Sequence, residues 1–132
     1  MNTLRLASSN SDVVLEFSDV DGDYFRVSVV ARDHSAMRDV YAYTDRSGIA
    51  RLFSEAAQEW RGWSGSKVWE SIEGELRLGL SADRLGHVTL EIRVRSDPGI
   101  SDRWQLEADL GLEAGQLDRI AGEAHRLWCE GG

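Results

Sequence analysis

The sequence predicts an α+β domain: one antiparallel sheet of about six to seven strands, with two helices packed on one face. Three observations lead to this class. Apolar and polar residues alternate in several segments that glycine-containing turns separate, and two later stretches place apolar residues at helical spacing. The chain has 132 residues, 42% of them hydrophobic, and contains one proline. We therefore expect a single domain over residues 1–132, ordered strands, helix, three strands, helix.

Three strands are predicted in the first part of the chain, and the second and third lie on either side of the run DVDGD. "TLRLA" near the start predicts a short edge strand, and "DVVLEF" and "YFRVSVVAR" each keep their apolar residues on one face. A three-residue loop that ends at Gly22 gives glycine the position that needs a positive φ. This loop sets Asp19 opposite Asp23 and Phe17 opposite Phe25. The segment therefore predicts a β-hairpin.

A second hairpin is predicted around Gly86, which ends the loop Arg84-Leu85-Gly86. Its register sets Asp83 opposite His87. The outer face pairs Glu75 with Arg95, among other charges of both signs, as expected for a solvated sheet face. Two more strands are expected in "MRDVYAYT", whose inward face is ambiguous, and in "WQLEADL". The inward residues of the last strand are expected to be Trp104, Leu106, Ala108 and Leu110.

Two stretches predict amphipathic helices. In "SGIARLFSEAAQEW" one apolar stripe runs from Ile49 to Trp60, and Asp45 or Ser47 can cap the start of the helix. In "EAGQLDRIAGEAHRLW" the stripe begins at Leu117, and Glu113 near the start suits the helix dipole. The second stripe continues through Ile120, Ala121, Ala124 and either Leu127 or Trp128.

The segment "WRGWSGSKVW" holds three of the five tryptophans. Gly62 and Gly65 allow a tight reversal after the first helix, so Trp63 and Trp69 can fold back as a staple between helix and sheet. The other interpretation is an aromatic patch that binds a partner, because tryptophan is enriched at interface hot spots. Both interpretations remain open on the sequence, and Trp63 and Trp69 are candidate partner-binding residues.

The net charge of the chain indicates which classes of partner it could bind. The formal net charge of −8 disfavours nucleic acid, since phosphate binding needs a clustered basic surface. The excess of acid favours either plain solubility or attraction to a basic protein. Asp19, Asp21 and Asp23 form the densest acidic turn, and we include them among the candidate partner-binding residues. The turn resembles part of a calcium loop, but Val30 stands where the closing glutamate is needed.

The sequence predicts no catalytic, cofactor or metal site. The three histidines lack the spacing of a metal pair, and Ser64 in "GWSGS" has a serine where a nucleophile elbow needs glycine. Glu73 and Glu75 would share a strand face, but nearby arginines compete for them. We expect no membrane span and no secretory signal, and the lone Cys129 favours a reducing, cytoplasmic location.

The stretch from "EWRGWSGSKVW" to "HVTLEIRVR", followed by "LGLEAGQLDRIAGEAHRLW", resembles an uncharacterised family of small actinobacterial and proteobacterial proteins. The shared elements are a Trp-x-Gly-Trp corner, a Ser-Ile/Leu-Glu-Gly-Glu-Leu-Arg strand, a Gly-His-Val-Thr-Leu strand and a Leu-Glu-x-Gly-Gln-Leu helix start. That family implies no activity. The order of elements is also similar to that of wall-associated-protein immunity proteins, which are small acidic antidotes to secreted bacterial toxins.

Together these features favour a non-enzymatic cytoplasmic domain that binds a protein, in the manner of an immunity protein that masks a basic partner. One alternative is a small-ligand-binding or enzymatic domain that uses a cleft between helices and sheet. Another is a structural subunit of a homo-oligomer joined through sheet edges.

Overall fold

The computed structural model describes residues 3–97, 99 and 101–130, and these form eight strands and two α-helices. A short 3₁₀ turn over Ala114–Gln116 leads into the second helix, and a π-helical turn over Arg126–Glu130 follows it. The remaining elements, in chain order, are β1 (Leu4–Ala7), β2 (Val14–Asp21), β3 (Tyr24–Val30), β4 (Ser35–Tyr41), α1 (Gly48–Gln58), β5 (Lys67–Glu70), β6 (Leu76–Ala82), β7 (His87–Arg95), β8 (Gln105–Glu113) and α2 (Leu117–His125).

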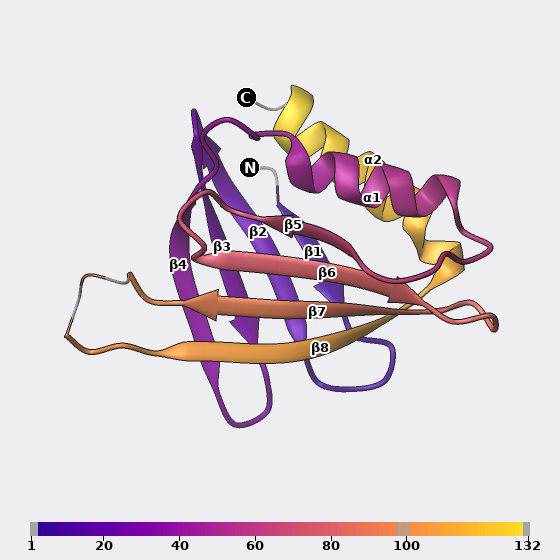
Figure 1. Cartoon of the computed structure of the whole chain (residues 1–132), viewed down its shortest axis with the longest axis horizontal. Coiled ribbons are helices and arrows are strands. Elements are labelled where there is room, and N and C mark those ends of the chain that lie inside the picture. The colour runs from indigo at the N-terminus through magenta and orange to yellow at the C-terminus, as the bar shows by residue number, and fades with distance from the viewer. Residues whose placement is uncertain (1–2, 98, 100, 131–132) are drawn as a thin grey trace.

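The strands form two antiparallel sheets of four strands each, in the orders β1-β2-β3-β4 and β5-β6-β7-β8. The α+β class is confirmed, but the prediction of one sheet of six to seven strands is wrong. Each sheet is a simple meander followed by one helix, so the same order of elements occurs twice. In Figure 1 the strands of one sheet cross behind those of the other, and the helices lie side by side at one end. None of the helices in the described ranges is long and apolar enough to cross a membrane.

One hydrophobic core fills the space between the two sheets and the helices. Phe25 of β3 lies where these layers meet. Its ring centroid is 5.9 Å from that of Phe17, 5.4 Å from that of Trp128 and 6.3 Å from that of Trp69. These four aromatic rings come from both sheets and from the C-terminal turn. Since aromatic side chains bury large areas, this cluster contributes strongly to holding the layers together.

The second hairpin has the predicted register. Leu80 pairs with Leu90, Gly86 has a φ of +87°, and the side chain of Asp83 accepts hydrogen bonds from the backbone N–H groups of Leu85 and His87. These bonds lower the pKa of Asp83, with the bond from His87 as the largest cause. Local side-chain chemistry thus fixes this turn as the sequence suggested.

The first hairpin has a different register. Phe17 pairs with Val27 rather than with Phe25, and a bulge lies between Ser18 and Asp21. Asp19 within the bulge has a φ of 53°. The register differs from the predicted one by two residues, and an even shift leaves each side chain on its predicted face. The facing of Phe17 and Phe25 toward the core is therefore correct although their pairing is wrong.

The helices follow the predicted stripes with differences at their ends. Helix α1 ends at Gln58, so Trp60 leaves the stripe and is 55% exposed. Ser47 and Asp45 make no capping hydrogen bond from their side chains to the helix start. After α2 the π-helical turn brings both Leu127 and Trp128 into the core. The strand β5 was missed by the sequence analysis, and Trp104, expected to face inward, is 41% exposed.

Candidate partner-binding surface

Two of the three tryptophans of the "WRGWSGSKVW" segment, Trp63 and Trp69, hold parts of the fold together. Trp69 on β5 is 5% exposed, and its indole N–H donates to Oδ2 of Asp45 at 3.1 Å. Trp63 is half-buried, donates to the backbone carbonyl of Leu80 at 3.1 Å, and has the Lys67 ammonium 5.3 Å from its ring centroid. The Trp63 contacts join the segment after α1 to the second sheet, and the Trp69 contact joins β5 to the segment before α1, as the staple interpretation expects. Trp69 has no exposed ring face for a partner.

The three predicted aspartates divide between two places on the first sheet. Asp19 lies within 4.0 Å of the Arg26 guanidinium and does not face Asp23, which corrects the predicted like-charge pair. Asp21 pairs with Tyr24 across the turn, and Asp23 directly precedes Tyr24. No group of three metal-ligating side chains occurs within residues 3–97, 99 and 101–130. Two of the candidate acids, Asp21 and Asp23, thus lie next to a tyrosine.

That tyrosine belongs to an exposed aromatic row, which we call the tyrosine face: Tyr24, Tyr41 and Tyr43. Tyr24 and Tyr41 are register partners on β3 and β4, and their ring centroids are 5.0 Å apart. The rings of Tyr41 and Tyr43 are stacked at 5.7 Å with an interplanar angle of 5°. Tyr24 and Tyr43 are 54% and 51% exposed. Three rings therefore form a continuous, ordered aromatic surface.

Backbone pairing explains why the three tyrosines lie next to one another. Tyr24 and Tyr41 face each other across an antiparallel pair, and the N–H of Ala42 donates to the carbonyl of Asp23 at 2.7 Å. This bond continues the pairing past the end of β4. Tyr43 then lies on the same side as Tyr41, because side chains two residues apart in extended chain share a face. The β2–β3 turn and the end of β4 lie together at the upper left of Figure 1.

The second sheet supports the tyrosine face through Glu75. This residue is 3% exposed, and its Oε2 accepts the backbone N–H of Tyr41 at 3.0 Å. Its Oε1 accepts the hydroxyl of Ser71, which is also buried. The prediction that Glu75 faces solvent beside Arg95 is wrong for the side chain, because the chain turns before β6 and directs the carboxyl group toward β4. Glu75 therefore fixes the β5–β6 turn against the end of β4.

Acidic groups surround the tyrosine face. The pKa of Tyr41 is raised, first by burial and then by the negative charge of Asp23, with a smaller contribution from Glu73. These causes favour the protonated hydroxyl of Tyr41, which can donate a hydrogen bond. Asp21, Asp23 and Glu73 make no ion pair with any described residue. Their charges are free to act on a partner.

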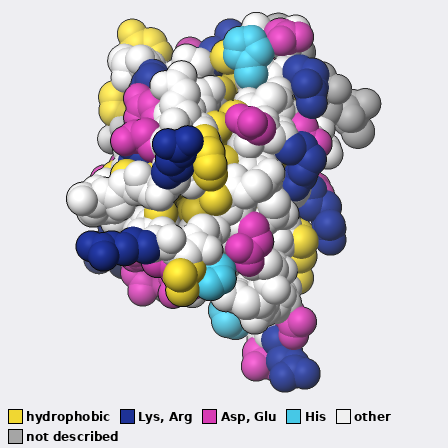
Figure 2. All heavy atoms as spheres, turned by 90° about the vertical axis from the view of Figure 1, so that its right-hand side faces the viewer, with side chains coloured by type: hydrophobic (Ala, Val, Ile, Leu, Met, Phe, Trp, Pro, Cys, Tyr) yellow, Lys and Arg dark blue, Asp and Glu magenta, His cyan; other side chains and the backbone are white. Residues whose placement is uncertain are grey.

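The opposite side of the molecule looks different. Figure 2 shows the side at the right of Figure 1, toward which the β6–β7 turn projects. Basic and acidic side chains are interspersed there around a narrow hydrophobic strip. Sequence reasoning missed the tyrosine face, because the alternation in "DVYAYT" did not reveal which side of that strand is buried. The available signal was the Tyr-x-Tyr spacing, which places Tyr41 and Tyr43 on one face.

The fold and this surface define a small α+β domain of two antiparallel four-stranded sheets and two helices, with an exposed aromatic row at one end. The chain matches the family described as "Family of unknown function (DUF6228)" over residues 3–130, and it belongs to that family. No curated protein matches the chain. The match to a family of unknown function confirms the uncharacterised small-domain family expected from the sequence.

Proposed function

We propose that this domain binds another protein through the tyrosine face, and that the contacted surface of the partner is basic. The observation that carries the proposal is the row of three neighbouring tyrosine rings at the surface, two of them more than half exposed. Tyrosine offers a large apolar ring and a polar hydroxyl, which is why it is enriched at protein interfaces. An ordered row of such rings therefore favours a protein as the partner.

Preorganisation strengthens this proposal. A side chain that is ordered on binding costs about 0.5–1.5 kcal/mol. Tyr41 is already held between its two neighbours, so a partner would meet rings that have lost much of their freedom. Uncommitted acids at Asp21, Asp23 and Glu73, together with the net charge of −8, would attract a basic partner and speed its association.

The finer proposal is that the domain acts as an immunity-like antidote that masks a basic toxin in the cytoplasm. Acidity, small size and the order of elements support it. An edge-paired homo-oligomer is a second candidate, because β4 and β8 end their sheets and Met37 on β4 is 61% exposed. A ligand-binding or enzymatic domain would need a cleft between the helices and the sheets. That alternative lacks support, because core side chains fill this space.

The experiment compares the wild-type chain with the double variant Tyr24→Ala/Tyr43→Ala and with Trp60→Ala. Trp60 is an equally exposed aromatic residue at the end of α1, outside the tyrosine face. Partners are captured by cross-linking in lysate of the source cells, beginning with products of neighbouring genes, and the purified partner is then titrated. We expect the double variant to weaken binding at least about 100-fold, the effect of two hot-spot residues, and Trp60→Ala to leave it unchanged.

Asp23→Asn/Glu73→Gln tests the charge component separately. It should slow association, and the wild-type association rate should fall steeply as salt is raised from about 20 to 200 mM. If the double tyrosine variant binds the partner as tightly as Trp60→Ala does, the proposed surface is wrong. Sedimentation of the chain alone at a multiple of the monomer mass, abolished by Met37→Asp, would favour the homo-oligomer instead.

A further inference from the structure

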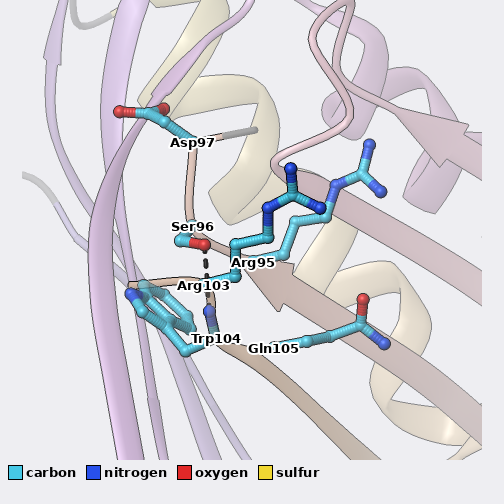
Figure 3. A pocket seen from close by; sticks show the side chains of 6 residues that line it. All are labelled: Arg95, Ser96, Asp97, Arg103, Trp104 and Gln105. Atoms are coloured by element: carbon cyan, nitrogen blue, oxygen red, sulfur yellow. Dashed lines mark hydrogen bonds between the residues drawn. The ribbon is translucent and has the colours of Figure 1, made fainter. Parts of the chain in front are cut away.

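A separate hollow of about 400 Å³ lies where β7 ends and β8 begins, and its lining includes none of the three tyrosines of the tyrosine face. Its lining consists of Arg95, Ser96, Asp97, Arg103, Trp104 and Gln105. Figure 3 shows the side chains of Arg95 and Arg103 extending side by side in one direction, with the Trp104 ring on the other side of the backbone. The backbone N–H of Trp104 donates to the hydroxyl of Ser96 at 3.0 Å, which fixes the two chain segments together.

Two carboxylates close to the hollow, those of Glu70 and Asp97, form ion pairs with other arginines. Arg93 donates to Oε2 of Glu70 at 2.7 Å, and Arg38 donates to Oδ1 of Asp97 at 2.8 Å. Arg38 also donates to the backbone carbonyl of Arg95 at 2.7 Å. Within the described residues, neither Arg95 nor Arg103 has a carboxylate within 4.0 Å. Both guanidinium groups thus lack an ion-pair partner among the described residues, in a protein whose net charge is −8.

The side chain of Arg95 packs against the β5–β6 turn. A Cβ atom at Gly74 would lie 2.3 Å from Nη2 of Arg95, so the guanidinium group rests directly against the backbone of the β5–β6 turn. Its Nε atom is buried and has no hydrogen-bond partner among the described residues. Because the buried Nε is out of reach of a ligand, an anion in the hollow would be bound by the Nη groups of Arg95, which make no hydrogen bond to a described residue.

We propose that this hollow binds the phosphate or carboxylate group of a small molecule, with Arg95 and Arg103 as the anion-binding residues. Guanidinium groups match both oxyanions, because their N–H donors lie in one plane and can bind two oxygens at once. The volume lies within the range of small-molecule sites. Gln105, the register partner of Arg95, adds a neutral amide to the rim.

The test titrates the whole chain with inorganic phosphate, phenyl phosphate and benzoate, by calorimetry and by amide chemical-shift mapping at constant ionic strength. Arg103→Gln removes the exposed arginine, and Arg95→Lys keeps a positive charge while it removes the planar donor set. Arg84→Gln is the matched control, since Arg84 is an exposed arginine in the β6–β7 turn outside the hollow.

We expect binding in the millimolar range or tighter for at least one of the phosphate probes or for benzoate, with shifts centred on residues 95–97 and 103–105. Arg103→Gln and Arg95→Lys should each weaken it at least about tenfold, whereas Arg84→Gln should not. Stronger binding of the phosphates than of benzoate would identify a phosphorylated ligand, and the reverse a carboxylated one. The proposal is overturned if no probe binds at about 10 mM, or if all three variants bind alike.

Discussion

The buried carboxyl group of Glu75 offers the sharpest test of how the two sheets support the tyrosine face. Glu75→Ala would leave the backbone N–H of Tyr41 and the hydroxyl of Ser71 without their acceptor. Each buried polar group left unsatisfied costs about 1–3 kcal/mol, and part of the Tyr41 cost is relieved because that residue is only half-buried. We therefore expect a loss of about 2–4 kcal/mol in the free energy of unfolding, or roughly 10 °C in Tm.

The assay is urea denaturation followed by tryptophan fluorescence and, in parallel, by circular dichroism. Glu75→Gln keeps one acceptor oxygen and should lose roughly half as much. Glu91→Ala, an exposed glutamate on β7, is the control and should stay within about 0.5 kcal/mol of the wild type. If Glu75→Ala were as stable as Glu91→Ala, the carboxyl group would not join the sheets as we describe.

Two further predictions concern turns. Gly74→Ala and Gly22→Ala should each destabilise the fold by about 1 kcal/mol, since both glycines have a positive φ, +75° and +60°, that a residue with a Cβ adopts only under strain. A Cβ at Gly74 would also lie 2.3 Å from Nη2 of Arg95, but that atom is the end of a flexible side chain and can move aside. Thermal melts compare both variants with the wild type. The pKa of Asp83 is lowered in the folded chain, so its stabilising effect is present above the ordinary aspartate pKa and lost as pH falls through the folded value. Asp83→Asn should flatten the acid limb of the stability–pH curve, and an unchanged limb would contradict the turn geometry.

Much of the local structure was predictable because single residues determine it. Gly86 and Asp83 set the second hairpin, and the buried stripe of α1 from Ile49 to Ala56 follows directly from its spacing. The first hairpin was mispaired because the bulge at Asp19 adds chain length to one strand only. Alternation reports which face is buried, and it is blind to a register shift of two residues.

The division into two sheets could not be predicted, because a pattern of alternating residues does not say where pairing between consecutive strands stops. Strand β5 was not predicted because it has only four residues and directly follows a segment rich in glycine and tryptophan. Glu75 read as a surface residue because charged side chains rarely lie fully buried. Only the fold reveals that this carboxyl group reaches the backbone of Tyr41, and that Arg95 and Arg103 converge.

The most direct test of the account is a map of amide hydrogen exchange for the chain alone and in complex with its captured partner. Binding should slow exchange at residues 21–24, 41–43 and 71–75, which form the β2–β3 turn, the end of β4 and the β5–β6 turn. Residues 84–86 of the β6–β7 turn, which projects toward the side shown in Figure 2, should be unaffected. Protection confined to the β6–β7 turn and the helices would contradict the proposed role of the tyrosine face.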